Sequence, residues 1–215
     1  NNLALQGIAF SPYYAKRGNH IITVATEHKA VLDCCAFLES RGIQVTYLPV
    51  DGGGRIDLDQ LAAAITPETI LVSVMHANNE TGVLQPIREI GALCTRREVL
   101  FHTDATQSFG KEPIDVERDR IDLFSLSAHK IYGPKGVGAL YVRRKGPRVR
   151  CAPILHGGGH ERGLRSGTLN VPGIVGFGEA ARLARERRAS DVTRLAALRD
   201  RLWTRLRDAL PDVHL

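Results

Sequence analysis

The sequence predicts an α/β fold in which a mostly parallel sheet is covered by helices on both faces. Short runs of β-branched residues alternate with longer segments whose apolar residues recur at helical spacing. This alternation is typical of parallel sheets, because parallel neighbours are joined by crossover helices that bury both faces of the sheet. The 215 residues, of which 43% are hydrophobic, are sufficient for one large domain with a substantial core.

The first part of the chain contains three predicted strands separated by two predicted helices. In chain order these are the strand 20–25, the helix 28–42, the strand 44–50, the helix 57–65 and the strand 69–77. Gly42 suits the end of the first helix, since glycine readily adopts the left-handed conformation found there. Asp57 is the expected N-cap of the second helix.

The second part of the chain continues the same alternation. The predicted helix 86–98 has Pro86 at its expected first position. Three further strands are predicted, and the pattern from Pro172 to the end of the chain is helical; the strands are 99–105, 122–129 and 136–144. Acidic residues are interspersed among the arginines of the last helical segment, which is typical of a solvated helix face. Neither repeats nor a linker are found, so we expect a single domain.

Composition and charge exclude several classes of protein. The net charge of +6 comes from mixed charges, so nucleic acid is not an expected partner. No apolar run reaches the roughly 20 residues that cross a bilayer, and no secretory signal segment opens the chain, so we expect no membrane partner. The four cysteines form no Cys-x-x-Cys pair, which favours a reduced, cytoplasmic setting. Met75 is the only methionine, and we therefore expect the chain to be a fragment.

Polar residues follow three of the predicted strands at the points where these strands end. In open parallel sheets, ligands bind at the carboxyl ends of the strands. We therefore expect one crevice to be lined by the polar residues in these positions: His76, Asn78, Asn79, Asp104, Gln107, Ser127, His129 and Lys130.

Lys130 is well placed to act as a Schiff-base amine. It lies in the segment SLSAHKIYGPKGVGALYV, directly after a predicted strand and before a glycine-rich turn. A lysine of this kind must be partly desolvated so that its neutral amine can attack a carbonyl. The alternative is an ordinary surface lysine beside a turn. The segment GPKGVG lacks the spacing of a phosphate-binding P-loop.

The segment HTDATQS suits a pyridine cofactor. Asp104 would keep a ring nitrogen protonated, and Gln107, three residues further on, would bond the phenolic oxygen of the ring. A carboxylate in this position is the partner that pyridoxal phosphate requires. The alternative is that Asp104 caps a helix that begins at Ala105.

Further segments have both a functional and an ordinary structural interpretation. His28 could stack on an aromatic ring or be an ordinary first-turn residue. The asparagines of HANNETGV could bind a ligand or form a turn. The segment HGGGHERGLRSGTLN suggests an anion site, with a plain loop as the alternative. A metal site is not expected, because glycines separate His156 from His160 and no cysteine pair is available.

Five segments, taken in their order, resemble one protein family. These are TEHKAVLD, MHANNETGV, HTDATQSFGK, SAHKIYGPKGVGALYVRR and HGGGHERGLRSGTL. They make the chain similar to cysteine desulfurases of the NifS/IscS type, which are pyridoxal-phosphate enzymes of the class V aminotransferase group. The resemblance runs from Asn1 to about Trp203. It implies that residues 1–215 form the cofactor-binding large domain of a fold-type I transferase.

The resemblance also implies how the cofactor ring is held. Lys130 would bind pyridoxal 5'-phosphate (PLP) covalently as a Schiff base, and His28 would stack on the ring. Asp104 would pair with the ring nitrogen, and Gln107 would pair with the phenolic oxygen. Lys130 and His28 are thus the implied catalytic residues.

The phosphate and the substrate have implied partners too. Ser127 and His129 would hold the phosphate, and Asn79 would lie near the substrate carboxylate and the ring oxygen. Thr168 would reach the phosphate of the other subunit's cofactor, which implies a homodimer.

The implied reaction converts L-cysteine to L-alanine and passes sulfur to an enzyme cysteine as a persulfide. The final acceptor would be an iron–sulfur scaffold or another sulfur-acceptor protein. The persulfide cysteine must be mobile and have a low pKa. Cys34, Cys35 and Cys94 fall in predicted helices and Cys151 in a different segment, so none of them is expected to have this role.

By the same resemblance, a phosphate-cradling loop would precede Asn1 and a small domain would follow Leu215. The isolated chain is therefore not expected to sustain multiple turnovers. Two alternatives stay open. One is another class V enzyme, such as an aminotransferase or a selenocysteine lyase, and the other is a non-catalytic split or degenerate subunit of a sulfur-transfer complex. The presence of Lys130, Asp104 and Gln107 favours an enzyme.

Overall fold

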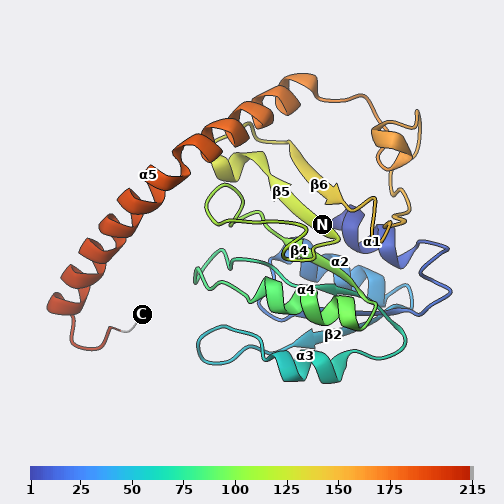
Figure 1. The fold of residues 1–215 in the computed structure, drawn as a ribbon, viewed down its shortest axis with the longest axis horizontal. Coiled ribbons are helices and arrows are strands. Elements are labelled where there is room, and N and C mark those ends of the chain that lie inside the picture. The colour runs from blue at the N-terminus through green and yellow to red at the C-terminus, as the bar shows by residue number, and fades with distance from the viewer. Residues whose placement is uncertain (214–215) are drawn as a thin grey trace.

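The computed structural model describes residues 1–213 and contains a six-stranded sheet (Figure 1). The strand order is β2-β1-β3-β4-β5-β6, and the first five strands in this order are parallel to one another. The edge strand β6 runs antiparallel to β5. The predicted mostly parallel sheet is confirmed, with these bounds: β1 (His20–Val24), β2 (Gln44–Leu48), β3 (Thr69–Ser73), β4 (Leu100–Asp104), β5 (Leu123–Ser127) and β6 (Gly138–Val142).

Helices cover both faces of the sheet. Helices α1 (Asn2–Ala9) and α2 (Lys29–Glu39) bury their apolar side chains on one face. Helices α3 (Leu58–Ala64) and α4 (Ile87–Arg96) bury theirs on the other. Successive strand residues alternate between the two layers, as Ile21 and Ile22 of β1 do, because side chains along a strand point to opposite faces. This double burial explains why the central strands β1, β3 and β4 are buried along their whole length.

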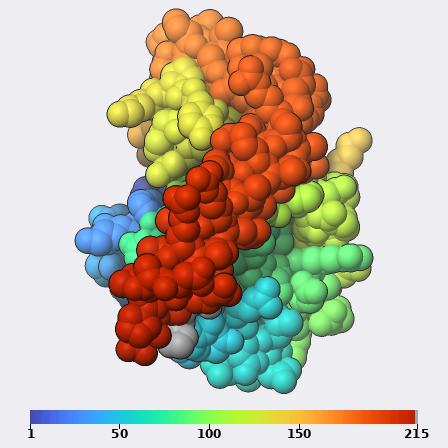
Figure 2. Space-filling model, turned by 90° about the vertical axis from the view of Figure 1, so that its left-hand side faces the viewer, coloured from blue at the N-terminus to red at the C-terminus, as the bar shows by residue number. Residues whose placement is uncertain are grey.

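The last helix, α5 (Val171–Ala209), begins on the sheet domain and extends away from it (Figure 1). In Figure 2 its red half lies in front of the rest of the molecule, on the side that faces the viewer. Phe177 and Ala180 in its first turns pack on the short 3-10 helix η1 (Ala128–Ile131). Beyond them, the apolar side chains of α5 are exposed: Val192, Leu195, Leu198, Leu202 and Leu206. A second 3-10 helix, η2 (Glu161–Gly163), lies in the long loop before α5. Among residues 1–213, no helix combines the length and the apolar character that a membrane crossing demands.

Several predicted boundaries need correction. The helix predicted over 28–42 ends at Glu39, and Gly42 lies in the following turn with a φ of +86°. Pro86 is the N-cap of α4, so its predicted first helical position is wrong by one residue. The last helix ends at Ala209, and residues 214–215 at the predicted helical end lie outside the described residues. Asp57 is the N-cap of α3 as predicted, and its Oδ1 accepts the backbone N–H of Asp59 at 2.7 Å.

Arg143 is a buried residue that anchors an ion cluster at the amino ends of the parallel strands, opposite the candidate site. Its partner Asp122 is also buried, whereas the Glu117 side chain is 76% exposed. Its guanidinium donates to both carboxylate oxygens of Glu117, at 2.8 and 2.9 Å, and lies 3.3 Å from Asp122. It also donates to the backbone carbonyls of Val116 and Ile121. The cluster lines a cavity of about 710 Å³. Because this cavity lies at the edge of the sheet where ligands of α/β folds seldom bind, we assign the candidate site to the opposite edge.

Candidate active site

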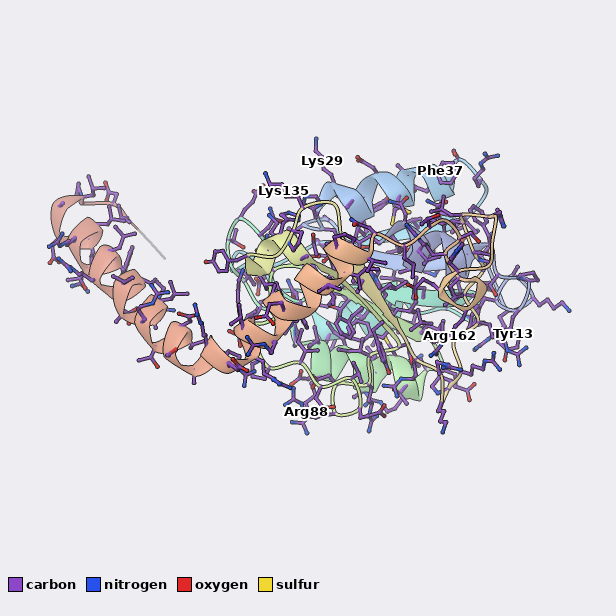
Figure 3. All side chains as sticks on the ribbon, turned by 90° about the horizontal axis from the view of Figure 1, so that it is seen from above. Tyr13, Lys29, Phe37, Arg88, Lys135 and Arg162 are labelled. Atoms are coloured by element: carbon purple, nitrogen blue, oxygen red, sulfur yellow. The ribbon has the colours of Figure 1, made fainter. Side chains whose placement is uncertain are left out.

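The carboxyl ends of β3, β4 and β5 bring most of the predicted residues to one edge of the sheet. Asp104 is the last residue of β4 and is paired in register with Ser125 of β5. Lys130 lies in η1, which follows β5 directly. Seen from above in Figure 3, Lys29 at the start of α2 and Lys135 in the turn after η1 lie on the same side of the molecule. The elements that carry these predicted residues therefore meet at one edge of the sheet.

Asp104 is a buried carboxylate that remains ionised. It accepts a hydrogen bond from Asn1 Nδ2 at 2.7 Å and another from the backbone N–H of Thr106 at 2.9 Å. Burial alone would raise its pKa, but these hydrogen bonds outweigh burial and hold the pKa below its ordinary value. No helix begins at Ala105, where the chain enters a turn, so the interpretation of Asp104 as a helix cap is wrong. A buried negative charge at this edge suits a cationic ligand atom.

Lys130 is exposed, so the partial desolvation expected of a Schiff-base lysine is not found in this structure. Two groups that suit a phosphate lie at the start of the same 3-10 helix. Ser127 Oγ and His129 Nδ1 are 2.7 Å apart, which places a hydroxyl and an imidazole together at the start of η1. The turn continues through Tyr132, which has a left-handed φ of +64°. Partial desolvation and the charge of Lys130 lower the pKa of Lys111. A second ammonium group therefore lies near Lys130, and the local potential is positive.

His28 and the loop after β3 form another part of the edge. His28 is the N-cap of α2, and its Nδ1 accepts the Ala30 backbone N–H at 3.1 Å. This bond fixes the imidazole at the start of the helix while the side chain stays exposed. Asn78 donates to the Thr26 carbonyl at 3.0 Å and so ties its loop to the end of β1. Asn79, the next residue, is exposed.

The structure does not bring every predicted residue to this edge. Gln107 does lie there, half-buried in the turn after β4 and three residues beyond Asp104. Thr168 is exposed in the loop before α5, and no hydrogen bond joins it to another candidate residue within residues 1–213. In the same described part of the chain, no group of His, Cys, Asp and Glu is arranged to hold a metal ion.

Glu27 is a feature of this edge that the sequence reasoning missed. It is 5% exposed, and its Oε1 accepts the Met75 backbone N–H at 2.5 Å. Its Oε2 is buried without a hydrogen-bond partner. Burial raises the pKa of Glu27 to about 8, so the side chain is largely protonated at neutral pH. A glutamate in the turn directly before His28 was the only available signal, and it is too common to be informative alone.

We expect Glu27→Gln to change how stability depends on pH. Between the ordinary pKa of 4.5 and about 8, folded Glu27 keeps a proton that the unfolded chain releases. The folded protein therefore loses stability as pH rises through this window, by at most about 1.4 kcal/mol per pH unit. Glutamine imitates the protonated acid and does not titrate. Urea unfolding of the cofactor-free protein at pH 5, 6, 7 and 8 should show wild type losing stability relative to the variant. If the difference in unfolding free energy between wild type and Glu27→Gln were the same at all four pH values, the conclusion that Glu27 is buried as a protonated acid would be wrong.

The polar groups at this edge fit PLP. The ionised carboxylate of Asp104 suits a protonated ring nitrogen, and the hydroxyl and imidazole of Ser127 and His129 suit a phosphate. The exposed amine of Lys130 suits an aldehyde. The buried, unpartnered Glu27 Oε2 is a polar atom that a bound molecule could satisfy.

Fold and site together define an α/β domain whose ligand-binding edge carries an amine beside a buried carboxylate. The family model of aminotransferase class-V proteins matches residues 1–215, and the chain belongs to that family. The cysteine desulfurase IscS of Haemophilus influenzae is 60% identical over 208 residues, which are 97% of this chain and 51% of that protein. The IscS of Edwardsiella ictaluri is 57% identical over 215 residues, covering 100% of this chain and 52% of that protein. The predicted NifS/IscS resemblance is confirmed.

Solved structures also superpose on this chain. A NifS-like protein superposes with a TM-score of 0.90 at 43% identity, over 96% of this chain and 56% of that one. SspA in complex with cysteine superposes with a TM-score of 0.79 at 49% identity, over 84% of this chain and 51% of that one. The chain spans about half the length of the curated relatives it matches.

Proposed function

We propose that the protein is a PLP-dependent cysteine desulfurase that converts L-cysteine to L-alanine and transfers sulfur as a persulfide. The observation that carries this proposal is the exposed Lys130 amine at the same sheet edge as the buried, ionised Asp104. The 57–60% identity to IscS desulfurases supports the reaction, and the neighbour in complex with cysteine supports the substrate. We propose that residues 1–215 form the cofactor-binding domain.

Different residues of this chain would have different roles at the cofactor ring. When bound, PLP supplies an electron-withdrawing ring that stabilises negative charge at the substrate Cα. Lys130 would hold the cofactor and then move the substrate Cα proton, as a neutral amine can. Asp104 would keep the ring nitrogen protonated, while Gln107 would bond the phenolic oxygen. His28, fixed by its bond to the Ala30 N–H, would lie against the ring.

The phosphate, the substrate and the second subunit would engage other residues. Ser127 and His129 would donate to the phosphate, and Asn79 would contact the substrate carboxylate. Thr168, which lies in the loop before α5, would reach the cofactor of the partner in a homodimer. An iron–sulfur scaffold or another sulfur-acceptor protein would take the persulfide sulfur.

The sulfur acceptor would be a thiol other than the four in this chain. Cys34, Cys35 and Cys94 are buried and Cys151 is half-buried. Burial raises the pKa of Cys35 to about 12 and that of Cys151 to about 11. It also raises the pKa of Cys34 and of Cys94. An acceptor must be a thiolate near neutral pH, so none of these groups suits the role. Their free state is in keeping with the reducing, cytoplasmic setting that we propose.

Product analysis tests the reaction. The PLP-loaded protein is mixed with an equimolar amount of L-cysteine and an external dithiol. We expect L-alanine, hydrogen sulfide and the oxidised dithiol, because cysteine loses one sulfur atom on becoming alanine and the two thiol groups supply the two electrons and two protons that reduce this sulfur to hydrogen sulfide. Transamination would instead give the 2-oxo acid of cysteine and an aminated cofactor. That outcome would assign the chain to the aminotransferases of its family, and the absence of both products would overturn the proposal.

A further inference from the structure

A buried histidine lies beneath Asp104 on the same face of β4. His102 is fully buried and precedes Asp104 by two residues, so their side chains point to the same face of the sheet. Its Nδ1 is 2.8 Å from Ser73 Oγ of β3, and its Nε2 is 2.9 Å from Ser125 Oγ of β5. One imidazole therefore joins three adjacent strands through side-chain hydrogen bonds.

This row of side chains is electrically neutral. Burial holds the pKa of His102 below its ordinary value, so the ring is uncharged at neutral pH. A neutral imidazole donates from one nitrogen and accepts at the other, and a serine hydroxyl can complement either one. Asp104 accepts hydrogen bonds from two neutral donors, Asn1 Nδ2 and the Thr106 N–H. It remains available to a cation.

Packing alone does not account for a histidine here. An apolar side chain could fill this part of the core without the cost of desolvating two ring nitrogens. Ser73 and His102 are the last residues of β3 and β4 paired in their register, and backbone bonds continue beyond them, because the His76 N–H donates to the Asp104 carbonyl at 3.0 Å. Beyond this pair, β4 continues to Asp104 beside β5. The side-chain bonds of His102 add to these backbone bonds and join β4 to both neighbours two residues before the carboxylate.

We propose that His102 is a positioning residue for Asp104: by bonding Ser73 and Ser125 it fixes the end of β4 so that the carboxylate meets the ring nitrogen of PLP. This inference rests on the function proposed above. It assigns no contact between His102 and the cofactor.

The same sheet contains a matched control at its opposite edge. His20 of β1 is 6% exposed, and its Nδ1 is 2.8 Å from Thr69 Oγ1 while its Nε2 is 2.9 Å from Thr46 Oγ1. It too joins three strands through two hydroxyls, and burial lowers its pKa. It differs from His102 in lying at the amino end of its strand, away from Asp104. If His102 had only a structural role, replacing either histidine would have the same effect on PLP binding.

The experiment compares His102→Leu, His20→Leu and wild type in two assays. The first is the melting temperature of the cofactor-free protein, and the second is the dissociation constant for PLP from an absorbance titration. We expect both variants to melt at lower temperature than wild type. We expect only His102→Leu to weaken PLP binding, by about tenfold, the lower end of the loss found when a residue that supports a ligand contact is removed. His102→Asn, whose amide can still bond Ser73, should recover part of the affinity.

Ser73→Ala is a milder second variant in case His102→Leu does not fold. It removes one hydroxyl from the row and should weaken PLP binding by about three- to tenfold, as the loss of one neutral hydrogen bond does. Unchanged affinity in whichever of these variants folds would overturn the inference, and so would an equal loss in His20→Leu. If wild type shows no PLP absorbance band that depends on Lys130, the proposed function itself is wrong. A normal wild-type band with unaffected His102 variants would instead leave the function intact and reject the positioning role.

Discussion

Asp104→Asn is expected to lower the rate at which the PLP-loaded protein consumes L-cysteine by roughly 100- to 1,000-fold, the loss typical of removing one preorganised electrostatic partner. Asparagine has nearly the same shape, and its Oδ1 can still accept the Thr106 N–H that now bonds Asp104 at 2.9 Å. The change removes the negative charge, and its new Nδ2 faces Asn1, whose amide can turn to present its unpartnered Oδ1 as the acceptor. Without that charge the ring nitrogen is no longer held protonated, and the ring withdraws electrons less strongly. Single-turnover rates measure the effect.

Asp57→Asn provides the control for this experiment. Asp57 caps α3, and asparagine is an equally good N-cap, so neither folding nor rate should change appreciably. Asp104→Asn should also keep its Lys130-dependent absorbance band, since covalent attachment does not need the carboxylate. A single-turnover rate within threefold of wild type would show that Asp104 is not the partner of the ring nitrogen.

Arg143→Ala is expected to lower the free energy of unfolding by about 3–5 kcal/mol, the range measured when one partner of a buried ion pair is removed. Arg143 is 4% exposed and binds Glu117, Asp122 and two backbone carbonyls. Burial already raises the pKa of Asp122, and the charge of Arg143 opposes that rise. The alanine variant leaves Asp122 buried without a cation and both carbonyls without this donor. Urea titrations report the change.

Arg199→Ala is the matched exposed control. Arg199 pairs with Asp200 at 2.7 Å, but both side chains are 65% exposed. Exposed ion pairs contribute about 0–1 kcal/mol, so this variant should unfold close to wild type. If Arg143→Ala also stayed within about 1 kcal/mol of wild type, the buried cluster would not have the structural role that its geometry indicates.

Local signals in the sequence were sufficient for most of the sheet and for the position of the site. The strands β1, β2 and β3 are runs rich in β-branched residues, and Asp57 caps its helix through its own side chain. The site followed from a topological rule, because polar residues that end parallel strands meet at one edge. That rule needs no knowledge of packing.

Features that depend on tertiary contacts were not predictable in this way. Helix α1 has only eight residues and contains Gly7, so its intrinsic propensity is low. Gly7 is required there because a Cβ would lie 2.1 Å from Cys151 Sγ, a contact between residues distant in sequence. The direction of β6 was also not foreseen. Residues 128–137 between β5 and β6 are too few for the crossover helix that a parallel neighbour requires. The length of this segment was the signal that the sequence reasoning missed.

The chemistry of the buried acids and histidines lay beyond the sequence for a similar reason. The protonated state of Glu27 results from burial beside Met75, which is far away along the chain. The bonds of His102 to Ser73 and Ser125 come from three different strands. Sequence spacing alone does not reveal which hydroxyls lie on neighbouring strands, because that depends on strand order and register.

The absorbance spectrum of the purified protein, titrated with PLP, tests the central claim most directly. Wild type is compared with Lys130→Ala and with Lys135→Ala, which removes an exposed lysine from the turn that follows η1. We predict a band in the near-violet region for wild type and Lys135→Ala, absent from Lys130→Ala and shifted when L-cysteine is added. A band that persists in Lys130→Ala, or a wild-type spectrum identical to that of free PLP, would contradict the assignment of Lys130 as the cofactor-binding lysine.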